Sequence, residues 1–325
     1  MVENAIVVQN LTKSFGSLTA VNDVTFAVPP SSIFGFLGPN GSEKSTVIRM
    51  LCGILSPTSG SARVLDFDVR KDSEKIRENI GYMSQKFSLY SELSAYENIT
   101  FYARLYGLKG KILAQRREEM MDLVGLTSRQ DQVAGNLSGG WKQRLALACA
   151  LVHDPKIVFL DEPTAGIDPV ARRKLWDLIF QLSAQGVTFF VTTHYMDEAE
   201  RCTQVGYIYL SNLIVCGMPD DLKSLPEITP QGYSRLEIMV ANTTEVLLAV
   251  GRLPYVQDAT IFGQSIHLLV SEEVSREKLC EELRQKGAMD IDVRPIRPTL
   301  EDVFVRLTFL HEQKEGNGNQ GRDFS

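Results

Sequence analysis

The stretch FLGPNGSEKST, residues 36–46, combines glycines, a lysine and a serine at a spacing that suits phosphate binding. A loop of the pattern G-x-x-x-x-G-K-[ST] turns several backbone N–H groups toward one anion at a helix start. Gly38, Lys44 and Ser45 fit this pattern, whereas position 43 holds Glu in place of Gly. Lys44 would contact the phosphates, and Ser45 would ligate Mg²⁺. The predicted nucleotide-binding residues of the loop are Gly38, Pro39, Asn40, Gly41, Ser42, Glu43, Lys44, Ser45 and Thr46.

Two adjacent carboxylates supply a second set of reactive groups, in IVFLDEP at residues 157–163. Ligands of open α/β sheets bind where buried parallel strands end, and this is where Asp161 stands. Asp161 is suited to hold Mg²⁺, directly or through water. Glu162 is suited to orient or deprotonate an attacking water. A polar strand end before a turn is the structural alternative, but the lysine loop upstream favours a shared site.

The segments around these residues predict the elements that hold them. Short apolar runs rich in β-branched and aromatic residues alternate with a helical pattern, which indicates a mainly parallel sheet covered on both faces. Two earlier segments alternate apolar and polar residues, as in strands with one exposed face, so we expect an antiparallel β layer beside the parallel core. The parallel strands are expected at 32–38, 156–163 and 186–194, a helix at 46–55, and the antiparallel strands at 5–15 and 18–28.

The rest of the chain predicts a helical insertion and a second domain. Apolar residues at helical spacing place a helical subdomain at about 89–140 within a first domain, residues 1–222. Beyond it, the order β-α-β-β-α-β predicts a small ferredoxin-like α+β domain at 223–310. Thr299 is a possible N-cap of its last helix. The polar tail, residues 311–325, is expected to be disordered.

Composition limits the class of protein. The 325-residue chain has a net charge of -6, which argues against a nucleic-acid binder that works through a general basic surface. Its five cysteines form no C-x-x-C pair, as expected for free thiols in a reducing compartment. No stretch approaches the roughly 18 uncharged apolar residues of a spanning helix. We therefore expect a protein that is soluble by itself and that could dock on a membrane protein.

The segment LSGGWKQRLALACAL, residues 137–151, resembles the signature of ATP-binding cassette (ABC) ATPases. It lies shortly before the carboxylate strand, as it does in that family. The resemblance covers roughly residues 7–222. It implies a P-loop NTPase of the ABC type, α/β with an antiparallel β layer and a helical insertion. The signature residues would be Ser138, Gly139 and Gly140, which contact ATP bound to another cassette.

The resemblance assigns further roles. Gln85 is similar to the Q-loop glutamine, which senses Mg²⁺ and the attacking water, so Ser45, Gln85 and Asp161 are the candidate metal ligands. Glu162, His194 and Gln85 are the candidate catalytic residues, with His194 matching the switch histidine. Asp168 matches the D-loop. Phe15 resembles the aromatic residue that stacks on adenine, although it could equally pack against the protein.

The family resemblance also implies partners. Two cassettes dimerise head to tail around ATP and Mg²⁺, so a second cassette is required, either a copy of this chain or a paired one. RPTLEDVFVRLT after a small α+β domain is similar to cassettes of ABC-2 type exporters, including the multidrug efflux branch. This implies transmembrane permease partners and a peripheral location on the cytoplasmic face of the inner (plasma) membrane.

Glu43 and Trp141 depart from the family pattern. Trp141 replaces a residue that is often Gln, and we expect a small effect. If the loop requires a positive φ at position 43, a residue other than Gly is strained by about 1–3 kcal/mol. A carboxylate about 5 Å from a phosphate charge is repelled by roughly 3 kcal/mol per charge. Glu43 could instead turn toward solvent, or pair with Lys44 and compete with ATP. We predict weaker ATP binding than in a Glu43→Gly variant.

Three functions fit the sequence. The first is the ATP-hydrolysing subunit of an exporter. The second is a soluble, non-transport ABC ATPase that acts on ribosomes or DNA. The third is a degenerate cassette that binds nucleotide weakly and regulates an active partner, which Glu43 alone favours.

Overall fold

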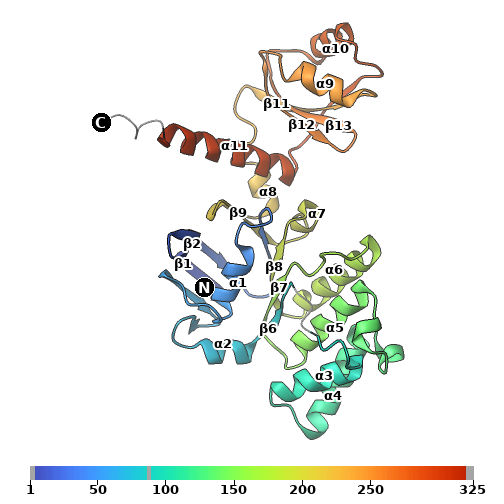
Figure 1. The fold of residues 1–325 in the computed structure, drawn as a ribbon. Coiled ribbons are helices and arrows are strands. Elements are labelled where there is room, and N and C mark those ends of the chain that lie inside the picture. The colour runs from blue at the N-terminus through green and yellow to red at the C-terminus, as the bar shows by residue number, and fades with distance from the viewer. Residues whose placement is uncertain (1–3, 86–88, 320–325) are drawn as a thin grey trace. The chain divides into compact units, whose positions relative to one another are not determined.

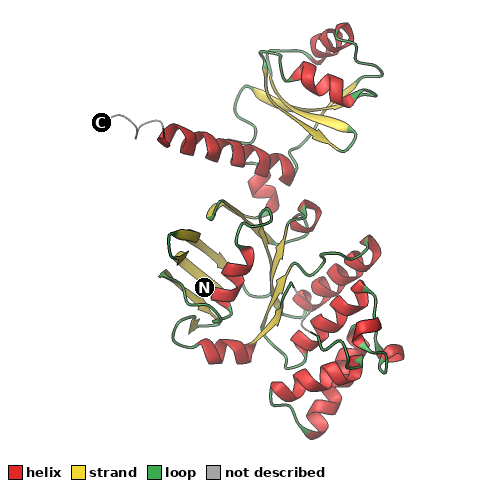
Figure 2. Ribbon diagram, in the orientation of Figure 1, coloured by secondary structure: helices red, strands yellow, loops and turns green. Residues whose placement is uncertain are grey.

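The computed structural model describes residues 4–85 and 89–319, with side chains described to residue 313. The chain divides into two compact units, Met1–Met218 and Pro219–Ser325. Each unit has its own sheet (Figures 1 and 2).

The first unit is built on a sheet with the strand order β5-β4-β1-β2-β10-β9-β3-β8-β7-β6. Strands β9, β3, β8, β7 and β6 run parallel to one another, whereas β5, β4, β1 and β2 form the predicted antiparallel layer. Strand β10 pairs with β2 in parallel and with β9 antiparallel. The strands are β1 (Ile6–Phe15), β2 (Leu18–Val28), β3 (Ile33–Leu37), β4 (Ser59–Val64), β5 (Phe67–Asp68), β6 (Ile80–Met83), β7 (Ile157–Asp161), β8 (Thr188–Thr193), β9 (Gln204–Tyr209) and β10 (Asn212–Gly217).

The central strands are apolar because both of their faces are covered. Every residue of β3, β7 and β8 is buried, as expected for parallel strands between two layers. Phe26 of β2 stacks on Phe34 of β3, with 5.2 Å between ring centroids, and Phe190 of β8 lies 5.3 Å from Phe34. These rings join the antiparallel layer to the parallel strands that end at the site.

Helices α3, α4, α5 and α6 of the first unit gather on the side of β6 and β7, whereas α1 lies beside β1 and β2 (Figure 1). Helix α3 begins with a capping box between Ser94 and Glu97. The aromatic residues of the insertion pack within the unit: Tyr106 stacks on His153 at 3.5 Å, and Arg117 lies 3.8 Å from the Tyr96 ring. The helices are α1 (Lys44–Leu51), α2 (Ser73–Asn79), α3 (Ala95–Leu105), α4 (Gly110–Leu123), α5 (Gly139–Leu151), α6 (Pro169–Ala184) and α7 (Met196–Ala199), with short 3-10 turns at Thr127–Arg129 and Ala134–Asn136.

The second unit has a four-stranded antiparallel sheet of order β12-β13-β11-β14. With two helices between its strands, this is the ferredoxin-like arrangement that the sequence predicts. One face of the sheet forms the core with α9 and α10, through residues such as Leu236, Ile266 and Leu279. The elements are α8 (Pro219–Lys223), β11 (Tyr233–Met239), α9 (Thr243–Val250), β12 (Val256–Phe262), β13 (Ser265–Ser271), α10 (Arg276–Gln285), β14 (Asp292–Pro295) and α11 (Leu300–Asn319).

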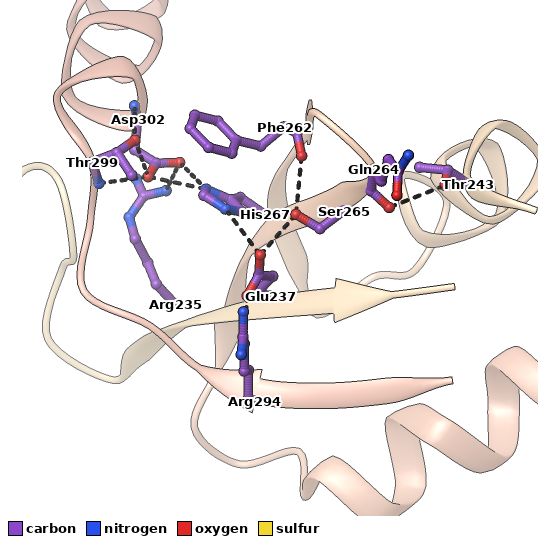
Figure 3. Close-up of polar contacts among 10 residues, drawn as sticks. All are labelled: Arg235, Glu237, Thr243, Phe262, Gln264, Ser265, His267, Arg294, Thr299 and Asp302. Atoms are coloured by element: carbon purple, nitrogen blue, oxygen red, sulfur yellow. Dashed lines mark hydrogen bonds and ion pairs between the residues drawn. The ribbon is translucent and has the colours of Figure 1, made fainter. Parts of the chain in front are cut away.

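A buried polar network lies between the sheet of the second unit and the start of α11 (Figure 3). Arg235 Nη1 donates to Asp302 Oδ1 at 3.2 Å, and His267 Nδ1 lies 3.1 Å from the same oxygen. Thr299 Oγ1 accepts from the backbone N–H of Asp302 at 3.2 Å, which confirms the expected N-cap. Glu237 accepts from Arg294 at 2.5 Å. The network therefore fixes α11 to the sheet.

Two predictions of domain organisation differ from the structure. Helix α8 belongs to the second unit because it contacts α11, so the boundary lies at Met218/Pro219 and not after residue 222. The segment 311–319 continues helix α11, where the sequence predicts a disordered tail. Once a helix is nucleated, each further residue is added easily, and Glu, Gln and Lys are good helix formers. Residues 320–325 lie outside the described part of the chain.

None of the helices in the described part of the chain combines the length and the apolar character that a membrane span needs.

Candidate nucleotide site

The phosphate loop connects β3 to α1, and two glycines give it its shape. A Cβ on Gly38 would lie 2.4 Å from the carbonyl oxygen of Ile208 and 2.3 Å from Ser42 Oγ, so only Gly fits there. Gly41 has φ +81, a conformation that L side chains rarely adopt. The loop leads directly into the N-terminus of α1, and a helix N-terminus is a favourable place to bind an anion.

Hydrogen bonds hold the side chain of Lys44 against the phosphate loop that precedes it. Its side chain is buried, and Nζ donates to the carbonyl oxygens of Gly38 at 2.9 Å and Pro39 at 3.0 Å. Nζ also lies 3.5 Å from Glu162 Oε1. Burial lowers the pKa of Lys44 and outweighs the opposite effect of Glu162. The ammonium group therefore lies at the phosphate loop and forms an ion pair with Glu162, the predicted base.

The neighbouring strand orients the two carboxylates. Asp161 ends β7 and is 2% exposed, and its Oδ1 accepts from Thr192 Oγ1 at 2.7 Å. The same Thr192 oxygen accepts from the backbone N–H of Glu162 at 2.9 Å. Glu162 has φ 50, which turns the chain sharply after the strand. Thr192 of β8 thus fixes the positions of both acids.

Gln85 and His194 lie near Glu162, and each follows the end of a different strand. Gln85 Nε2 donates to Glu162 Oε2 at 2.9 Å, and His194 Nδ1 lies 3.7 Å from that oxygen. Gln85 follows β6 and His194 follows β8. The parallel strands therefore bring these three predicted catalytic residues together with Lys44. A cavity of about 260 Å³ lies beside them and is lined by Asn40, Gly41, Glu43, Lys44, Ser45, Gln85 and Glu162.

Glu43 occupies the helix N-cap in a left-handed conformation, with φ 66 and ψ 24. Strain at position 43 is expected only if φ is positive there, and the structure has this positive φ. Its Oε2 accepts from Thr46 Oγ1 at 2.6 Å. The carboxylate lines the cavity, and the ion pair of Lys44 is with Glu162 and not with Glu43. Of the two alternatives for Glu43, the structure therefore does not show the pairing with Lys44.

The signature residues form a second cavity. Ser138 is the N-cap of α5, and Asp168 is the N-cap of α6, where its Oδ1 accepts from the N–H of Ala171 at 2.9 Å. A Cβ on Gly140 would lie 2.4 Å from the Cβ of Ala171, so Gly140 allows α5 and α6 to approach closely. Gly139 lies beside Ile167. The cavity is about 170 Å³ and is lined by Ser138, Gly140, Trp141, Arg144, Asp168, Val170, Ala171 and Lys174.

Phe15 is the last residue of β1. In the sheet, strands β2, β10 and β9 lie between β1 and β3. Its side chain is 49% exposed, and Lys13 Nζ lies 4.9 Å from the ring centroid. The ring is thus free to stack on a planar ligand. Its predicted contact with adenine stays a prediction.

Sequence reasoning misses two residues that support the site. Thr192 and Ile208 belong to strands β8 and β9 and shape the site through their neighbours, Asp161 and Gly38. The pair of threonines before His194 is a signal for Thr192, since a hydroxyl can donate to a carboxylate and accept from an N–H at the same time. No comparable signal marks Ile208, because it acts through its backbone.

A family profile described as "ABC transporter" matches residues 21–165. The chain is 49% identical over 222 residues to the "Probable multidrug ABC transporter ATP-binding protein YbhF" of Escherichia coli (strain K12), which covers 68% of this chain and 38% of that protein. The chain therefore spans less than two fifths of that relative's length.

Two other relatives match over nearly their whole length. The "Nod factor export ATP-binding protein I" of Sinorhizobium fredii is 37% identical, over 94% of this chain and 86% of that protein. The "Linearmycin resistance ATP-binding protein LnrL" of Bacillus subtilis is 32% identical, over 92% and 97%.

Solved structures agree with this relationship. The structure of cbiO1 from Clostridium perfringens, part of the ABC transporter complex cbiONQ, is similar to this chain with a TM-score of 0.64 and 28% identity, over 70% of this chain and 93% of that one. A dimeric post-hydrolysis ATP-binding cassette bound to ADP and Pi has a TM-score of 0.60 and 25% identity, over 66% and 98%.

Proposed function

The chain belongs to the ATP-binding cassette transporter family, and we propose that it is the ATP-binding and hydrolysing subunit of an ABC-2 type membrane exporter. The observation that carries the proposal is the convergence of Lys44, Gln85 and His194 on Glu162 beside the phosphate loop.

In the proposed reaction, Glu162 acts as the base for a water that attacks the γ-phosphate of ATP. Gln85, which donates to Glu162 at 2.9 Å, orients that carboxylate and the water. Lys44 neutralises charge on the phosphates, and His194 contacts the γ-phosphate. The loop N–H groups hold the remaining phosphate oxygens.

Ser45, Asp161 and Gln85 would hold Mg²⁺, which neutralises charge on the phosphates when it is bound with ATP. The described residues contain no cluster of three or more His, Cys, Asp or Glu that could hold a metal by itself. This fits Mg²⁺, because magnesium is usually held by one or two protein ligands together with phosphates and water. Asp161, fixed by Thr192, is the carboxylate suited to this task.

We propose that two cassettes form one working unit. The phosphate-loop cavity and the signature cavity have no lining residue in common. A second chain would therefore place its Ser138 and Gly140 over the nucleotide held by Lys44. The dimeric cassette with ADP and Pi, to which this chain is similar, supports this arrangement.

The proposed cargo follows from the relatives. Their names describe multidrug transport, Nod factor export and linearmycin resistance. We therefore propose export of an organic small molecule. These names favour transport over a soluble non-transport ATPase or a purely regulatory cassette.

A cavity of about 870 Å³ is the proposed docking site for a permease segment. It lies at α2, β6 and the end of α3, close in sequence to Gln85. Ile54 and Leu105 on its wall are 55% and 67% exposed, whereas Glu74, Arg77 and Glu78 supply charges. An amphipathic helix would match this mixed lining.

Membrane association tests the proposed partner. In cells that carry the full chain, Leu105→Asp should move most of it from the membrane fraction to the soluble fraction without a change in ATP affinity. Leu248→Asp changes a similarly exposed leucine of the second unit and is the matched control. Sedimentation with ribosomes, with no effect of Leu105→Asp, would instead favour a non-transport ATPase.

A further inference from the structure

Glu198 is a carboxylate buried next to the end of β8, apart from the carboxylates of the nucleotide site. The residue is 0% exposed and belongs to α7. Its Oε2 accepts from Thr193 Oγ1 at 2.7 Å. Burial of a carboxylate is costly unless donors and cations compensate for the lost hydration. The groups that contact Glu198 therefore indicate which part of the structure it stabilises.

The Thr193 hydroxyl closes a turn around His194. It donates to Glu198 and accepts from the backbone N–H of Tyr195 at 3.0 Å. His194 is the residue enclosed between these two contacts. The turn, and with it the place of the imidazole, thus depends on Glu198.

Arg172 of α6 contacts the residues that follow His194. Its Nε lies 3.6 Å from Glu198 Oε1, and Nη1 lies 3.8 Å from Asp197 Oδ2. Its guanidinium carbon lies 4.0 Å from the ring centroid of Tyr195. A planar guanidinium can stack on a ring and face carboxylates at the same time, whereas an ammonium group cannot.

The imidazole of His194 has few contacts of its own. Within the described part of the chain, Nδ1 has no hydrogen-bond partner, and it lies 3.7 Å from Glu162 Oε2. The rings of His194 and Tyr195 have centroids 4.1 Å apart and an interplanar angle of 37°. The orientation of His194 is therefore set by its turn and by Tyr195, both of which Arg172 contacts.

Arg172 directly follows Val170 and Ala171, which line the signature cavity. Arg172 lies on the first turn of α6, and its N–H donates to the carbonyl oxygen of Asp168 at 2.9 Å. Asp168 and Ser138 line the signature cavity. A shift at the start of α6 would thus move the guanidinium against Tyr195 and Glu198.

We propose that Arg172 and Glu198 are positioning residues that link the start of α6 to His194. Occupation of the signature cavity then changes the placement of His194 against Glu162 in the same chain. The inference rests on the proposed ATPase function, because it gives His194 a role in hydrolysis.

The contact itself is tested by NMR of the imidazole signals of the full chain. The chain has four histidines, and His194→Ala assigns the signal of His194. Arg172→Ala and Glu198→Gln should shift this signal, because the Tyr195 ring moves against it, and should leave the others in place. Arg172→Lys, which keeps the charge but lacks the planar group, should also shift it. Arg173→Ala, an exposed neighbour on α6, is the matched control and should leave it unchanged.

The role is tested by kinetics of ATP hydrolysis. Arg172→Ala should lower kcat by about tenfold, with KM changed less than about twofold, as expected for a group that acts after binding. In a His194→Ala background, Arg172→Ala should add less than about a twofold loss, because residues that act as a unit are not additive.

An unmoved His194 signal, or losses that multiply in the double variant, would overturn the inference. A change in KM alone would do the same. Failure of the proposed function looks different: neither the wild-type chain nor Glu43→Gly would then hydrolyse ATP. In that case the NMR result still decides whether Arg172 positions His194.

Discussion

The carboxylate of Glu43 accepts a hydrogen bond from the hydroxyl of Thr46 at 2.6 Å, within the first turn of the helix that follows the phosphate loop. This contact keeps the carboxylate at the helix N-terminus, where it lines the same cavity as Lys44 and Ser45. A negative group at a helix N-terminus is normally stabilising. Here it occupies the position that favours a phosphate, so we expect Glu43 to oppose phosphate binding at the loop.

Replacement of Glu43 by Gly should strengthen ATP binding by roughly tenfold to a hundredfold, because a repulsion of a few kcal/mol is removed. The Gly variant also adopts φ 66 without strain, which offsets the loss of the Thr46 hydrogen bond. Calorimetric titration of the full chain with a non-hydrolysable ATP analogue and Mg²⁺ measures the change.

Two further variants separate charge from backbone strain at this position. Glu43→Gln keeps the strained conformation and removes the charge, so it should recover most of the affinity. Asp66→Gly relieves the same φ of 66 in an exposed turn outside the cavity, and it should leave the affinity unchanged. Equal dissociation constants for the wild type, Glu43→Gly and Glu43→Gln would show that Glu43 does not oppose the nucleotide.

Gly140→Ala should separate α5 from α6, since its Cβ would lie 2.4 Å from the Cβ of Ala171. Overpacking of this kind costs about 1–3 kcal/mol. We expect a lower melting temperature and at least a tenfold lower rate of ATP hydrolysis, because the signature cavity lies at this contact. Adding Ala171→Gly frees the space and should restore most of both. A double variant as impaired as Gly140→Ala would rule out this contact as the cause.

Asp302→Asn should destabilise the second unit by roughly 3–5 kcal/mol, because it leaves the buried Arg235 without its carboxylate. Hydrogen exchange of β11 and β13 in the full chain measures the loss. Asp292→Asn, an exposed change on β14, is the matched control and should alter exchange little. Equal protection in both variants would contradict a stabilising role for the network.

The same carboxylate predicts how the stability of the second unit depends on pH. Burial raises the pKa of Asp302, but hydrogen bonds from His267 and Thr299 and the charge of Arg235 outweigh it and bring the pKa below its ordinary value of 3.8. A depressed pKa in the folded state means that the stabilisation is present above pH 3.8 and is lost as the pH falls below it. Thermal unfolding from pH 7 to pH 3 should show this loss in the wild type and a smaller one in Asp302→Asn.

Much of the fold follows from local sequence pattern. The apolar runs at β3, β7 and β8 are unambiguous because both faces of these strands are buried. Strands β9 and β10 are not predicted, because QVGYIY and NLIVCG are short and lack a clear alternation. Their place is set by pairing with β3 and β2, far away in the chain.

The residues of the site likewise divide into those that the sequence predicts and those that only side-chain packing places. The positions of Lys44, Glu162 and His194 follow from motifs, since Glu162 and His194 directly follow predictable strands and Lys44 follows the glycine-rich loop after another. The contact of Glu43 with Thr46 and the link from Arg172 to Glu198 depend on side-chain packing, which one sequence does not specify.

Phosphate release by the full chain with ATP and Mg²⁺ tests the ATPase function most directly, with Glu162→Gln as the comparison. We predict measurable release by the wild type, faster release by Glu43→Gly, and a loss of about a hundredfold or more in Glu162→Gln, which should still bind ATP because only the base is removed. Equal release by the wild type and Glu162→Gln, or no release by either the wild type or Glu43→Gly, would contradict hydrolysis at this site.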